Sequence, residues 1–424
     1  MNRISITTLG DLVEFQRGYD LPKSEFRSGN VPVISSNGIL GYHNHAKVKG
    51  PGITIGRSGT VGLPHYIDQD FFPHNTALFI KDFKGNHPKY IYYLLKTLSL
   101  NNRGTGSGVP TMNRNHLHPI KVSAHLDFNY QQNIAKILSD IDAKIELNNR
   151  INAQLEAMAK LIYDYWFVQF DFPYKKAGTE ALEGPYKSSG GKMVWNKELK
   201  REIPEGWEVK SIEVLTSFIS RGISPRYLDE GGICVLNQKC IRNRTVSFNE
   251  SRRCENNLSN SSSKHISKYD ILVNSTGVGT LGRVAIVNYL TNELITVDSH
   301  VTIIRANEQL IGKLYFGFSL LEKQKEIERL ALGSTGQVEL SRTELESLKL
   351  IVPSKKLQEN FKKIYKNCLD RMAANSQQNQ HLTSLRDWLL PMLMNGQVRV
   401  REDEKPVSSM AAEERGEYSG KRFK

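Results

Sequence analysis

The sequence predicts an α+β protein in which two strand-rich domains are joined to a pair of long helices that pack as an antiparallel coiled coil. Three observations support this fold class. The two halves of the 424-residue chain resemble each other, each half carries short apolar runs between Gly and Pro residues, and each half ends in a long segment with heptad periodicity. We therefore expect an internal duplication with pseudo-two-fold symmetry.

The duplication is clearest at the start and end of each globular half. Residues 104–122 align with residues 332–350 at an offset of 228, whereas residues 15–18 (FQRG) align with residues 219–222 (ISRG) at an offset of 204. Because the offset grows along the chain, the second copy carries insertions. One lies near residues 240–265, a polar stretch of the kind that forms surface loops.

Each globular half is predicted to be rich in strands, because its apolar runs are short and bounded by turn residues. The runs lie at residues 31–35, 52–56, 76–81, 233–237, 270–275 and 300–306. Short helices are expected at residues 88–100 and 311–332. The expected organisation is a first domain at 1–129, a helix at 130–172, a linker at 173–203, a second domain at 204–356, a helix at 357–400 and a disordered tail at 401–424.

The two long helices are expected from about Tyr130 to Val168 and from about Leu357 to Leu390, with Pro391 marking the end of the second. The first has two seam columns with 3–4 spacing, namely Ile134, Ile141, Asn148, Leu155 and Ile162, and Leu138, Ile145, Asn152, Ala159 and Trp166. Adding 227 gives the columns of the second: Phe361, Cys368, Asn375, Leu382 and Leu389, and Tyr365, Met372, Asn379, Arg386 and Leu393.

Asparagine occupies the same two seam positions in both helices. In antiparallel packing about a pseudo-two-fold axis, facing residues have a constant sum, which is 527 for Asn148 with Asn379 and for Asn152 with Asn375. A buried amide layer of this kind costs stability but fixes the register of the helices. The alternative is that these four asparagines face solvent and that their match is only a remnant of the duplication.

Composition favours a polyanionic partner without proving one. The formal net charge is +13 and the pI is about 9.4, and the last 24 residues contribute nothing to that excess. The four cysteines, Cys234, Cys240, Cys254 and Cys368, form no C-x-x-C pair, which argues against a disulfide framework or a zinc site. With no long apolar run and no signal-peptide core at the N-terminus, we expect a cytoplasmic protein without a membrane segment.

No catalytic motif is apparent. The stretch at residues 277–283 lacks the Lys-Ser/Thr of a phosphate-binding loop, and no Pro-Pro pair exists that could belong to an amino-methyltransferase motif. The pairs His43-x-His45 and His116-x-His118 could in principle share a metal, but no cysteine or acidic partner lies at ligand spacing. We interpret these histidines as surface or DNA-facing residues, and we expect neither a metal nor a bound cofactor in this chain.

Four segments in order resemble the specificity (S) subunit of Type I restriction–modification enzymes. They are residues 164–171 (DYWFVQFD), residues 185–193 (PYKSSGGKM), residues 202–209 (EIPEGWEV) and residues 389–400 (LLPMLMNGQVRV). The resemblance covers about residues 5–400. The charged tail after residue 400 matches nothing in that pattern.

The resemblance implies two target-recognition domains, each of which reads one half of a bipartite, asymmetric site in double-stranded DNA. It also implies that the long helices set the spacer between the half-sites and dock two methyltransferase (M) subunits, while restriction (R) subunits complete the complex. S-adenosylmethionine is then expected in the methyltransferase partner, and ATP and Mg in the restriction partner. This chain would be a non-catalytic DNA-recognition subunit.

The resemblance does not identify base contacts, so candidates come from side-chain chemistry. Arginine can read guanine, Asn and Gln can read adenine, and Ser, Thr and Lys mostly hold phosphates. The polar residues in Gly-flanked loops that we single out are Arg17, Arg57, Ser58, His74, Asn75, Thr111, Asn113 and Arg114 in the first domain, and Arg221, Asn237, Gln238, Lys239, Asn274, Ser275, Arg283, Ser299, His300 and Arg342 in the second. The alternative for each is a turn or solvated surface residue.

Other interpretations of the sequence stay open. The aromatic residues at the end of the first helix, Tyr163, Tyr165, Trp166, Phe167 and Phe170, either pack in the core of the neighbouring domain or form a docking surface for a partner helix. The whole chain could instead be an enzyme whose Gly-rich loops bind a nucleotide, but the phosphate-binding motif is missing. A coiled-coil scaffold that binds only protein is disfavoured by the positive charge and the Arg- and Asn-bearing loops.

Overall fold

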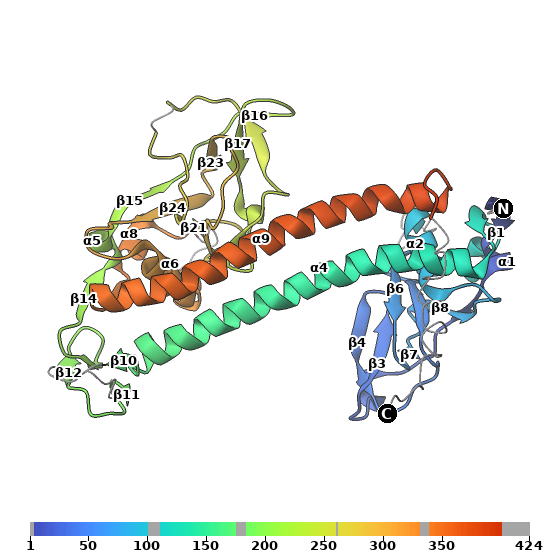
Figure 1. Cartoon of the computed structure of the whole chain (residues 1–424), viewed down its shortest axis with the longest axis horizontal. Helices are drawn as coiled ribbons and strands as arrows, with labels where there is room; N and C mark the ends of the chain where they lie inside the picture. Colours follow the sequence, from blue (N-terminus) through green and yellow to red (C-terminus); the bar gives the residue numbers. More distant parts are fainter. Residues whose placement is uncertain (1–3, 101–110, 175–183, 260–261, 331–338, 401–424) are drawn as a thin grey trace, which may run out of the picture. The chain divides into compact units, whose positions relative to one another are not determined.

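The computed structural model of the chain describes residues 4–100, 111–174, 184–259, 262–330 and 339–400. These residues form two compact units (Figure 1). Unit 1 comprises Met1–Leu147 and Gln378–Lys424, and unit 2 comprises Asn148–Gln377, so each unit holds one strand-rich domain and part of each long helix. The tail that we predicted to be disordered, and parts of the aligned segments 104–122 and 332–350, lie outside the described residues.

The domain of unit 1 contains two sheets closed by a terminal strand pair. Strands β1 (Ile4–Thr8) and β9 (Lys121–His125) pair antiparallel and bring the two ends of the domain together. The larger sheet has the order β2 (Glu14–Arg17), β8 (Ala77–Asp82), β5 (Gly52–Gly56) and β6 (Pro64–Ile67), and the smaller has β4 (Gly38–His43), β3 (Val31–Ser35) and β7 (Phe72–Pro73). Its helices are α1 (Leu9–Leu12), α2 (Pro88–Thr97) and α3 (Arg114–Leu117).

The domain of unit 2 repeats this frame. Strands β14 (Glu208–Ser211) and β25 (Lys349–Val352) close it. One sheet has the order β15 (Thr216–Arg221), β24 (Val301–Ala306), β21 (Ile271–Asn274), β22 (Val284–Ile286), β19 (Thr245–Val246) and β18 (Ile241–Arg242), and the other has β16 (Tyr227–Leu228), β20 (Arg252–Cys254), β17 (Ile233–Leu236) and β23 (Ile295–Val297). Its helices are α5 (Ile212–Leu215), α6 (Lys313–Glu322), α7 (Gln324–Leu330) and α8 (Arg342–Ser347).

The duplication is confirmed element by element. The order β2-β8-β5-β6 recurs as β15-β24-β21-β22, and the closing pair β1-β9 recurs as β14-β25. The order β4-β3-β7 recurs as β20-β17-β23, and the insertion predicted near residues 240–265 contributes the β18-β19 hairpin at one edge of the larger sheet. All six apolar runs predicted as strands are strands, and the helix expected at 311–332 is α6 and α7, interrupted at Lys323.

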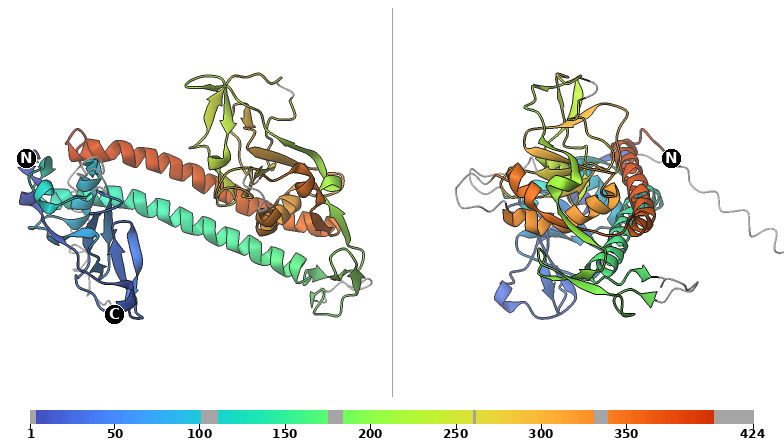
Figure 2. Two further views of the ribbon diagram at one scale, coloured as in Figure 1. Left: turned by 180° about the vertical axis from the view of Figure 1, so that it is seen from behind. Right: turned by 90° about the vertical axis from the view of Figure 1, so that its left-hand side faces the viewer.

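In each unit a short helix packs between the larger sheet and the long helices (Figure 2). In unit 2 this is α6, whose Tyr315 and Phe318 share one apolar core with Ile271 of β21 and with Phe361. In unit 1 it is α2, whose Ile91 and Leu94 share a core with sheet and long-helix residues. The domains are therefore packed directly against the helices through apolar side chains, which ties sheet orientation to helix orientation.

The long helices are α4 (Phe128–Tyr163), followed by a π-helical turn at Asp164–Val168, and α9 (Lys355–Met394). The prediction that α9 ends at Pro391 was wrong, because the helix continues to Met394. The proline ring is exposed, and the last turn is held by Leu390, Leu393 and Met394, which are buried in the core of unit 1. The chain leaves the helix at Gly396, whose positive φ of 75° favours glycine.

The predicted helix register is found within both units. In unit 1, Ile134 and Leu393, which the constant sum places opposite each other, belong to one core. In unit 2, the Asn375 amide donates to the Asn152 carbonyl oxygen at 2.8 Å, and Asn375 is buried. The second predicted pair, Asn148 with Asn379, involves residues of different units and stays a prediction.

The aromatic residues at and after the end of α4 mostly form core. Tyr163, Phe167 and Phe170 are buried in unit 2, where the Phe167 ring lies 4.7 Å from that of Tyr315. Tyr165 is exposed. Beyond them the linker forms two small hairpins, β10 (Pro173–Tyr174) with β11 (Gly184–Pro185), and β12 (Met193–Asn196) with β13 (Arg201–Pro204).

Candidate nucleic-acid interface

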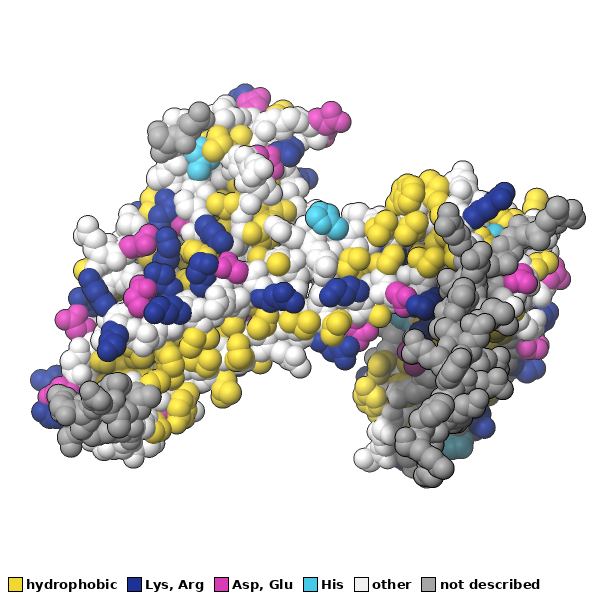
Figure 3. Space-filling view, viewed as in Figure 1, with side chains coloured by type: hydrophobic (Ala, Val, Ile, Leu, Met, Phe, Trp, Pro, Cys, Tyr) yellow, Lys and Arg dark blue, Asp and Glu magenta, His cyan; other side chains and the backbone are white. Residues whose placement is uncertain are grey.

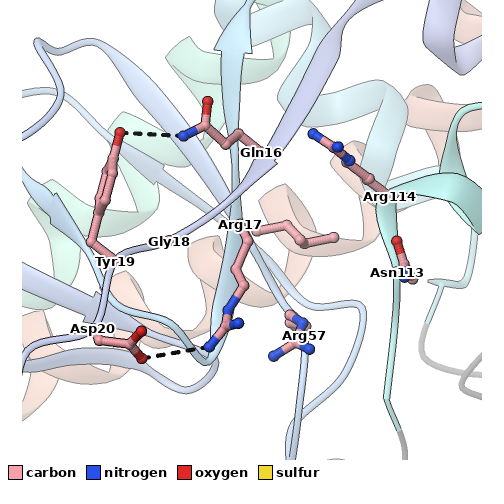
Figure 4. A pocket seen from close by; sticks show the side chains of 9 residues that line it. Gln16, Arg17, Gly18, Tyr19, Asp20, Arg57, Asn113 and Arg114 are labelled. Carbon is pink, nitrogen blue, oxygen red and sulfur yellow. Dashed lines mark hydrogen bonds and ion pairs between the residues drawn. The ribbon is translucent and has the colours of Figure 1, made fainter.

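A polar cleft of about 570 Å³ lies at one corner of the domain of unit 1 (Figure 4). We call it cleft 1. It is lined by Gln16, Arg17, Gly18, Tyr19, Asp20, Arg57, Leu78, Asn113 and Arg114. Four predicted DNA contacts meet here from three places in the sequence, namely the end of β2, the end of β5 and the start of α3. Arginine and asparagine side chains converging on one cleft have the chemistry to contact bases and phosphates.

The charge of cleft 1 is positive, since three arginines face one carboxylate. Arg17 forms an ion pair with Asp20 at 3.5 Å, and more than half of each side chain is exposed. Arg57 donates from Nη1 to the backbone oxygen of Asn75 at 3.5 Å. Figure 4 shows Arg17 turned toward Asp20 with Arg57 beside it. A cationic surface of this kind attracts a phosphate backbone.

The other predicted residues of unit 1 border cleft 1. The Asn75 amide donates to Asp20, while the His74 ring is hydrogen-bonded to the Thr76 hydroxyl at 3.1 Å. Ser58 and Thr111 face each other in a β-bridge. The Asn113 side chain accepts a hydrogen bond from the Asn115 N–H at 3.1 Å and so caps α3.

The interpretation of the paired histidines as surface or DNA-facing residues is wrong for His43, and His118 also packs within unit 1. Nε2 of His118 accepts a hydrogen bond from the Phe15 backbone N–H at 3.1 Å, and His43 is buried. Burial, with the charges of Lys84 and Arg114, lowers the pKa of His118. The neutral imidazole is therefore the form that supports the fold. Among the described residues, no group of His, Cys, Asp and Glu side chains is arranged to hold a metal ion.

The equivalent corner of unit 2 carries different side chains. Equivalence follows from shared backbone contacts: the N–H of Met112 donates to the Arg57 carbonyl at 2.8 Å, and the N–H of Leu340 donates to the Ser275 carbonyl at 3.0 Å. Where unit 1 has Arg57, unit 2 therefore has Ser275, which is buried and hydrogen-bonded to Thr302 at 2.6 Å.

Two arginines recur at this corner. Arg221 of β15 corresponds to Arg17 of β2, and Arg342, the first residue of α8, corresponds to Arg114 of α3. Arg221 forms an ion pair with Glu339, and Arg342 pairs with Glu346 at 2.6 Å. The corner of unit 2 thus keeps arginines but matches each with a carboxylate.

Unit 2 has a further polar cleft, of about 580 Å³, which we call cleft 2. It is lined by Tyr227, Asn237, Gln238, Lys239, Asn249, Glu250, Ser251, Arg252, Asp298 and His300. Lys239 and His300 are exposed, as predicted contacts should be, and Ser299 lies between Asp298 and His300 in the chain. Sequence reasoning missed Asn249 and Arg252, which lie in the polar stretch near residues 240–265 that we had interpreted only as a surface loop.

Cleft 2 contains a buried carboxylate. Asp298 accepts hydrogen bonds from the His300 backbone N–H at 3.0 Å and from the Tyr227 hydroxyl at 3.4 Å. Burial raises the pKa of Asp298, although these hydrogen bonds and the nearby charges of His300 and Arg252 act in the opposite direction. Asp298 therefore fixes the positions of two residues that line the cleft.

Three residues of unit 2 that we predicted as DNA contacts make hydrogen bonds inside the domain instead. The buried Asn237 accepts from the Lys239 N–H at 2.8 Å and donates to the Glu250 carbonyl at 2.6 Å, so it caps a 3-10 turn. Asn274 is fully buried and donates to the Gln238 and Thr280 carbonyls, both at 3.1 Å. Together with Ser275, these residues are buried and position the loops from inside the domain.

Arg283 lies apart from cleft 2. It donates to the Gly279 carbonyl at 2.8 Å and lines a smaller cleft of about 320 Å³ with Arg242, Asn243, Arg244, Val284 and Gln324. The Gln238 side chain accepts a hydrogen bond from Thr280 at 3.3 Å, which links cleft 2 to the same Gly-rich loop.

The long helices carry exposed apolar residues at repeated positions. Met158 and Leu161 of α4 are 44% and 68% exposed, and adding 227 gives Leu385 and Trp388 of α9, which are 45% and 55% exposed. Figure 3 shows hydrophobic side chains in a band along the part of α4 that belongs to unit 2. Each unit therefore bears one copy of an apolar helix surface. None of the helices in the described residues has an apolar stretch that could span a lipid bilayer.

Comparison with known proteins gives a consistent result. The family model described as "Type I restriction modification DNA specificity domain" matches residues 3–157 and 204–384. The "Type I restriction enzyme MjaIX specificity subunit" of Methanocaldococcus jannaschii is 27% identical over 326 residues, covering 74% of this chain and 70% of that protein. The "Type I restriction enzyme HindI specificity subunit" of Haemophilus influenzae is 26% identical over 319 residues, covering 63% of this chain and 67% of that protein.

A solved structure has the same fold. It is the crystal structure of the Type-I restriction-modification system S subunit from M. genitalium, which matches with a TM-score of 0.63 and 18% identity over 93% of this chain and 96% of that chain. The two family matches coincide with the two copies of the duplicated frame.

Proposed function

This chain belongs to the Type I restriction–modification DNA specificity family, and on that premise we propose that its two units read the two halves of one bipartite DNA site. A specificity subunit recognises DNA on behalf of other subunits, so the chain is a DNA-recognition subunit and not an enzyme. Family membership also implies that it holds no cofactor of its own.

One observation carries the proposal of two half-sites. The same frame occurs in both units with an arginine at the same place, Arg17 and Arg221, while the polar side chains around that arginine differ. Two similar surfaces with different hydrogen-bonding groups would read different sequences. We therefore expect a site that is bipartite but not palindromic.

The proposed contact surface is narrower than the set of residues chosen from the sequence. In unit 1 it is cleft 1 with its border, namely Arg17, Arg57, Ser58, His74, Asn75, Thr111, Asn113 and Arg114. In unit 2 it comprises Arg221, Gln238, Lys239, Arg283, Ser299, His300 and Arg342, with Asn249 and Arg252 added from cleft 2. Asn237, Asn274 and Ser275 support these loops from inside the domain.

We propose that the long helices set the spacer between the half-sites. Helices α4 and α9 have 36 and 40 residues, which corresponds to roughly 54 and 60 Å at about 1.5 Å per residue. Both helices take part in both units, and the Asn152–Asn375 hydrogen bond supports a single register between them.

We further propose that the exposed apolar residues of the helices dock methyltransferase subunits. One copy of this surface is centred on Leu161 and the other on Trp388, and two equivalent surfaces fit two copies of the same partner. Restriction subunits would join the complex that the methyltransferase subunits form with this chain. In such a complex, S-adenosylmethionine would bind the methyltransferase subunits, and ATP and Mg the restriction subunits.

The experiment that tests the function is methylome sequencing of cells with and without this gene. We expect a bipartite, asymmetric methyladenine motif that disappears when the gene is deleted and returns when it is restored. An unchanged methylome after deletion would contradict the proposal. Restoring the gene with cleft 1 altered should change one half of the motif and leave the other half intact.

A further inference from the structure

The same arginine is fixed at one corner of both units. Arg17 stands opposite Leu78 in the β2–β8 pair, and Arg221 stands opposite Thr302 in the β15–β24 pair. A glycine follows each arginine and lies against a neighbouring backbone: a Cβ on Gly18 would be 2.1 Å from the His74 carbonyl oxygen. The equivalent atom on Gly222 would be 2.0 Å from the Val297 carbonyl oxygen. Larger residues cannot replace these glycines without moving backbone, so the main chain beside each arginine is held in place.

Each arginine is paired with a carboxylate, but the carboxylate comes from a different place in each unit. In unit 1 it is Asp20, three residues after Arg17. In unit 2 the position equivalent to Asp20 is Ser224, and the carboxylate comes instead from Glu339, just before α8. The backbone oxygen of the next residue, Leu340, also accepts a hydrogen bond from Arg221 at 3.1 Å.

The position equivalent to Glu339 in unit 1 is Thr111, which has no charge. This equivalence follows from the shared backbone contacts of Met112 and Leu340 described above. The two units therefore reach the same arginine–carboxylate pair by different residues.

Folding does not explain these pairs. The side chains are 53% and 73% exposed for Arg17 and Asp20, and 36% and 53% exposed for Arg221 and Glu339. Exposed ion pairs contribute little to stability. A carboxylate on a surface that meets DNA also repels phosphates, so it weakens non-specific binding. What a carboxylate does provide is a fixed orientation of the planar guanidinium fork, which has five N–H donors in total.

We propose that Arg17 and Arg221 each read one guanine, one in each half-site, and that Asp20 and Glu339 are positioning residues that hold the guanidinium groups for this contact. This inference rests on the proposed function. The N–H groups not used by the carboxylate match O6 and N7 of guanine, a contact that arginine makes in two parallel hydrogen bonds. Each half-site then contains one guanine that Arg17 or Arg221 recognises, while the surrounding bases are recognised by the residues that differ between the clefts.

The test uses the full chain co-expressed with its methyltransferase and restriction subunits, and methylome sequencing as the readout. Arg17→Ala should relax a single guanine position in one half of the motif, and Arg221→Ala a single guanine position in the other half. Discrimination at that position should fall by about 5- to 150-fold. The matched control is Arg329→Ala on α7, an exposed arginine outside both clefts, which should leave the motif unchanged.

The charge-preserving variants Arg17→Lys and Arg221→Lys guard against a loss of folding. Lysine keeps the positive charge but lacks the fork, so these variants should still methylate DNA and should relax the same guanine position. If the wild-type chain gives a bipartite motif and the lysine variants give that identical motif, this inference is overturned while the proposed function stands. If the wild-type chain gives no bipartite motif, the proposed function itself fails.

The positioning role has its own test, because the carboxylate that pairs with Arg221 can be moved to another position. Glu339→Thr, which copies unit 1, should relax the same base as Arg221→Lys and leave the salt dependence of DNA binding unchanged. Adding Ser224→Asp, which supplies a carboxylate at the position of Asp20, should restore discrimination. If Glu339→Thr changes binding to all DNA sequences equally, without relaxing one base and with no rescue by Ser224→Asp, the positioning role is refuted.

Discussion

The hydrogen bond between Asn152 and Asn375 gives the sharpest test of how the helices are held in register. Asn375 is 5% exposed, and its amide donates to the Asn152 carbonyl oxygen at 2.8 Å. Asn375→Ala leaves that oxygen in the seam without its donor, which should lower the free energy of unfolding by about 1–3 kcal/mol. Asn152→Ala removes the acceptor and should have a cost of the same order.

The double variant separates a coupled pair from two independent residues. In Asn152→Ala/Asn375→Ala neither partner remains to be left unsatisfied, so the cost should be less than the sum of the single costs by about 0.5–1.5 kcal/mol. The matched control is Asn367→Ala, at an exposed position of α9, which should be nearly neutral.

Urea denaturation of the full chain followed by tryptophan fluorescence measures these differences. Three of the four tryptophans, Trp166, Trp195 and Trp207, lie in unit 2 with the asparagine pair. Additive costs in the double variant, or an Asn375→Ala cost no larger than that of Asn367→Ala, would refute the reasoning. Leucine at both positions should preserve stability but allow the helices to shift, which would appear as more than one spacer length in the methylated motif.

Three further predictions concern stability, acid sensitivity and assembly. Glu322→Gln should destabilise unit 2 by about 1–3 kcal/mol in the same urea assay, because Glu322 accepts from Lys160 at 2.9 Å and from Arg244 at 2.5 Å and joins α4 to the domain; no measurable change would contradict this. Unit 1 should lose stability as the pH falls below about 6.5, because burial lowers the pKa of His118 and of His125 in the folded state and protons therefore bind the unfolded chain more strongly. Calorimetry should show a smaller loss of stability at low pH in His118→Gln than in the wild-type chain. An equal loss would count against His118 as a source of the pH dependence. Leu161→Ser and Trp388→Ser should each reduce the number of methyltransferase subunits bound per chain by one, as measured by native mass spectrometry, whereas unaltered binding in both would exclude these surfaces as docking sites.

The fold could be predicted from the sequence because its signals are local and repeated. Six apolar runs bounded by turn residues became strands, and heptad spacing fixed which faces of α4 and α9 meet. Asn152 and Asn375, which the constant sum of 527 places opposite each other, are joined by a hydrogen bond. The end of α9 was predicted wrongly, because burial of the leucines next to Pro391, a property of tertiary structure, overrides the usual effect of proline.

The candidate contacts were harder to predict because asparagine in a glycine-flanked loop has two uses. Its amide can face a ligand, or it can satisfy nearby backbone groups, as Asn237 and Asn274 do. The two uses have the same local sequence, and only burial distinguishes them. Arg252 was missed for another reason: it lies on β20, which takes the place of β4 beside the central strand, but the sequence of this segment shows no similarity to that of β4.

The way this corner is built explains how its side chains can vary while the frame persists. The segments around Arg57 and Ser275 are held by equivalent backbone hydrogen bonds, from Met112 in one unit and Leu340 in the other. Backbone groups are the same for every residue, so these bonds place no demand on the side chain at either position. An arginine that lines a cleft and a serine buried against Thr302 therefore occupy the same site in one frame. A surface whose geometry does not depend on its polar side chains can change its DNA sequence without changing its fold, and for that reason we expect the two half-sites of this chain to differ.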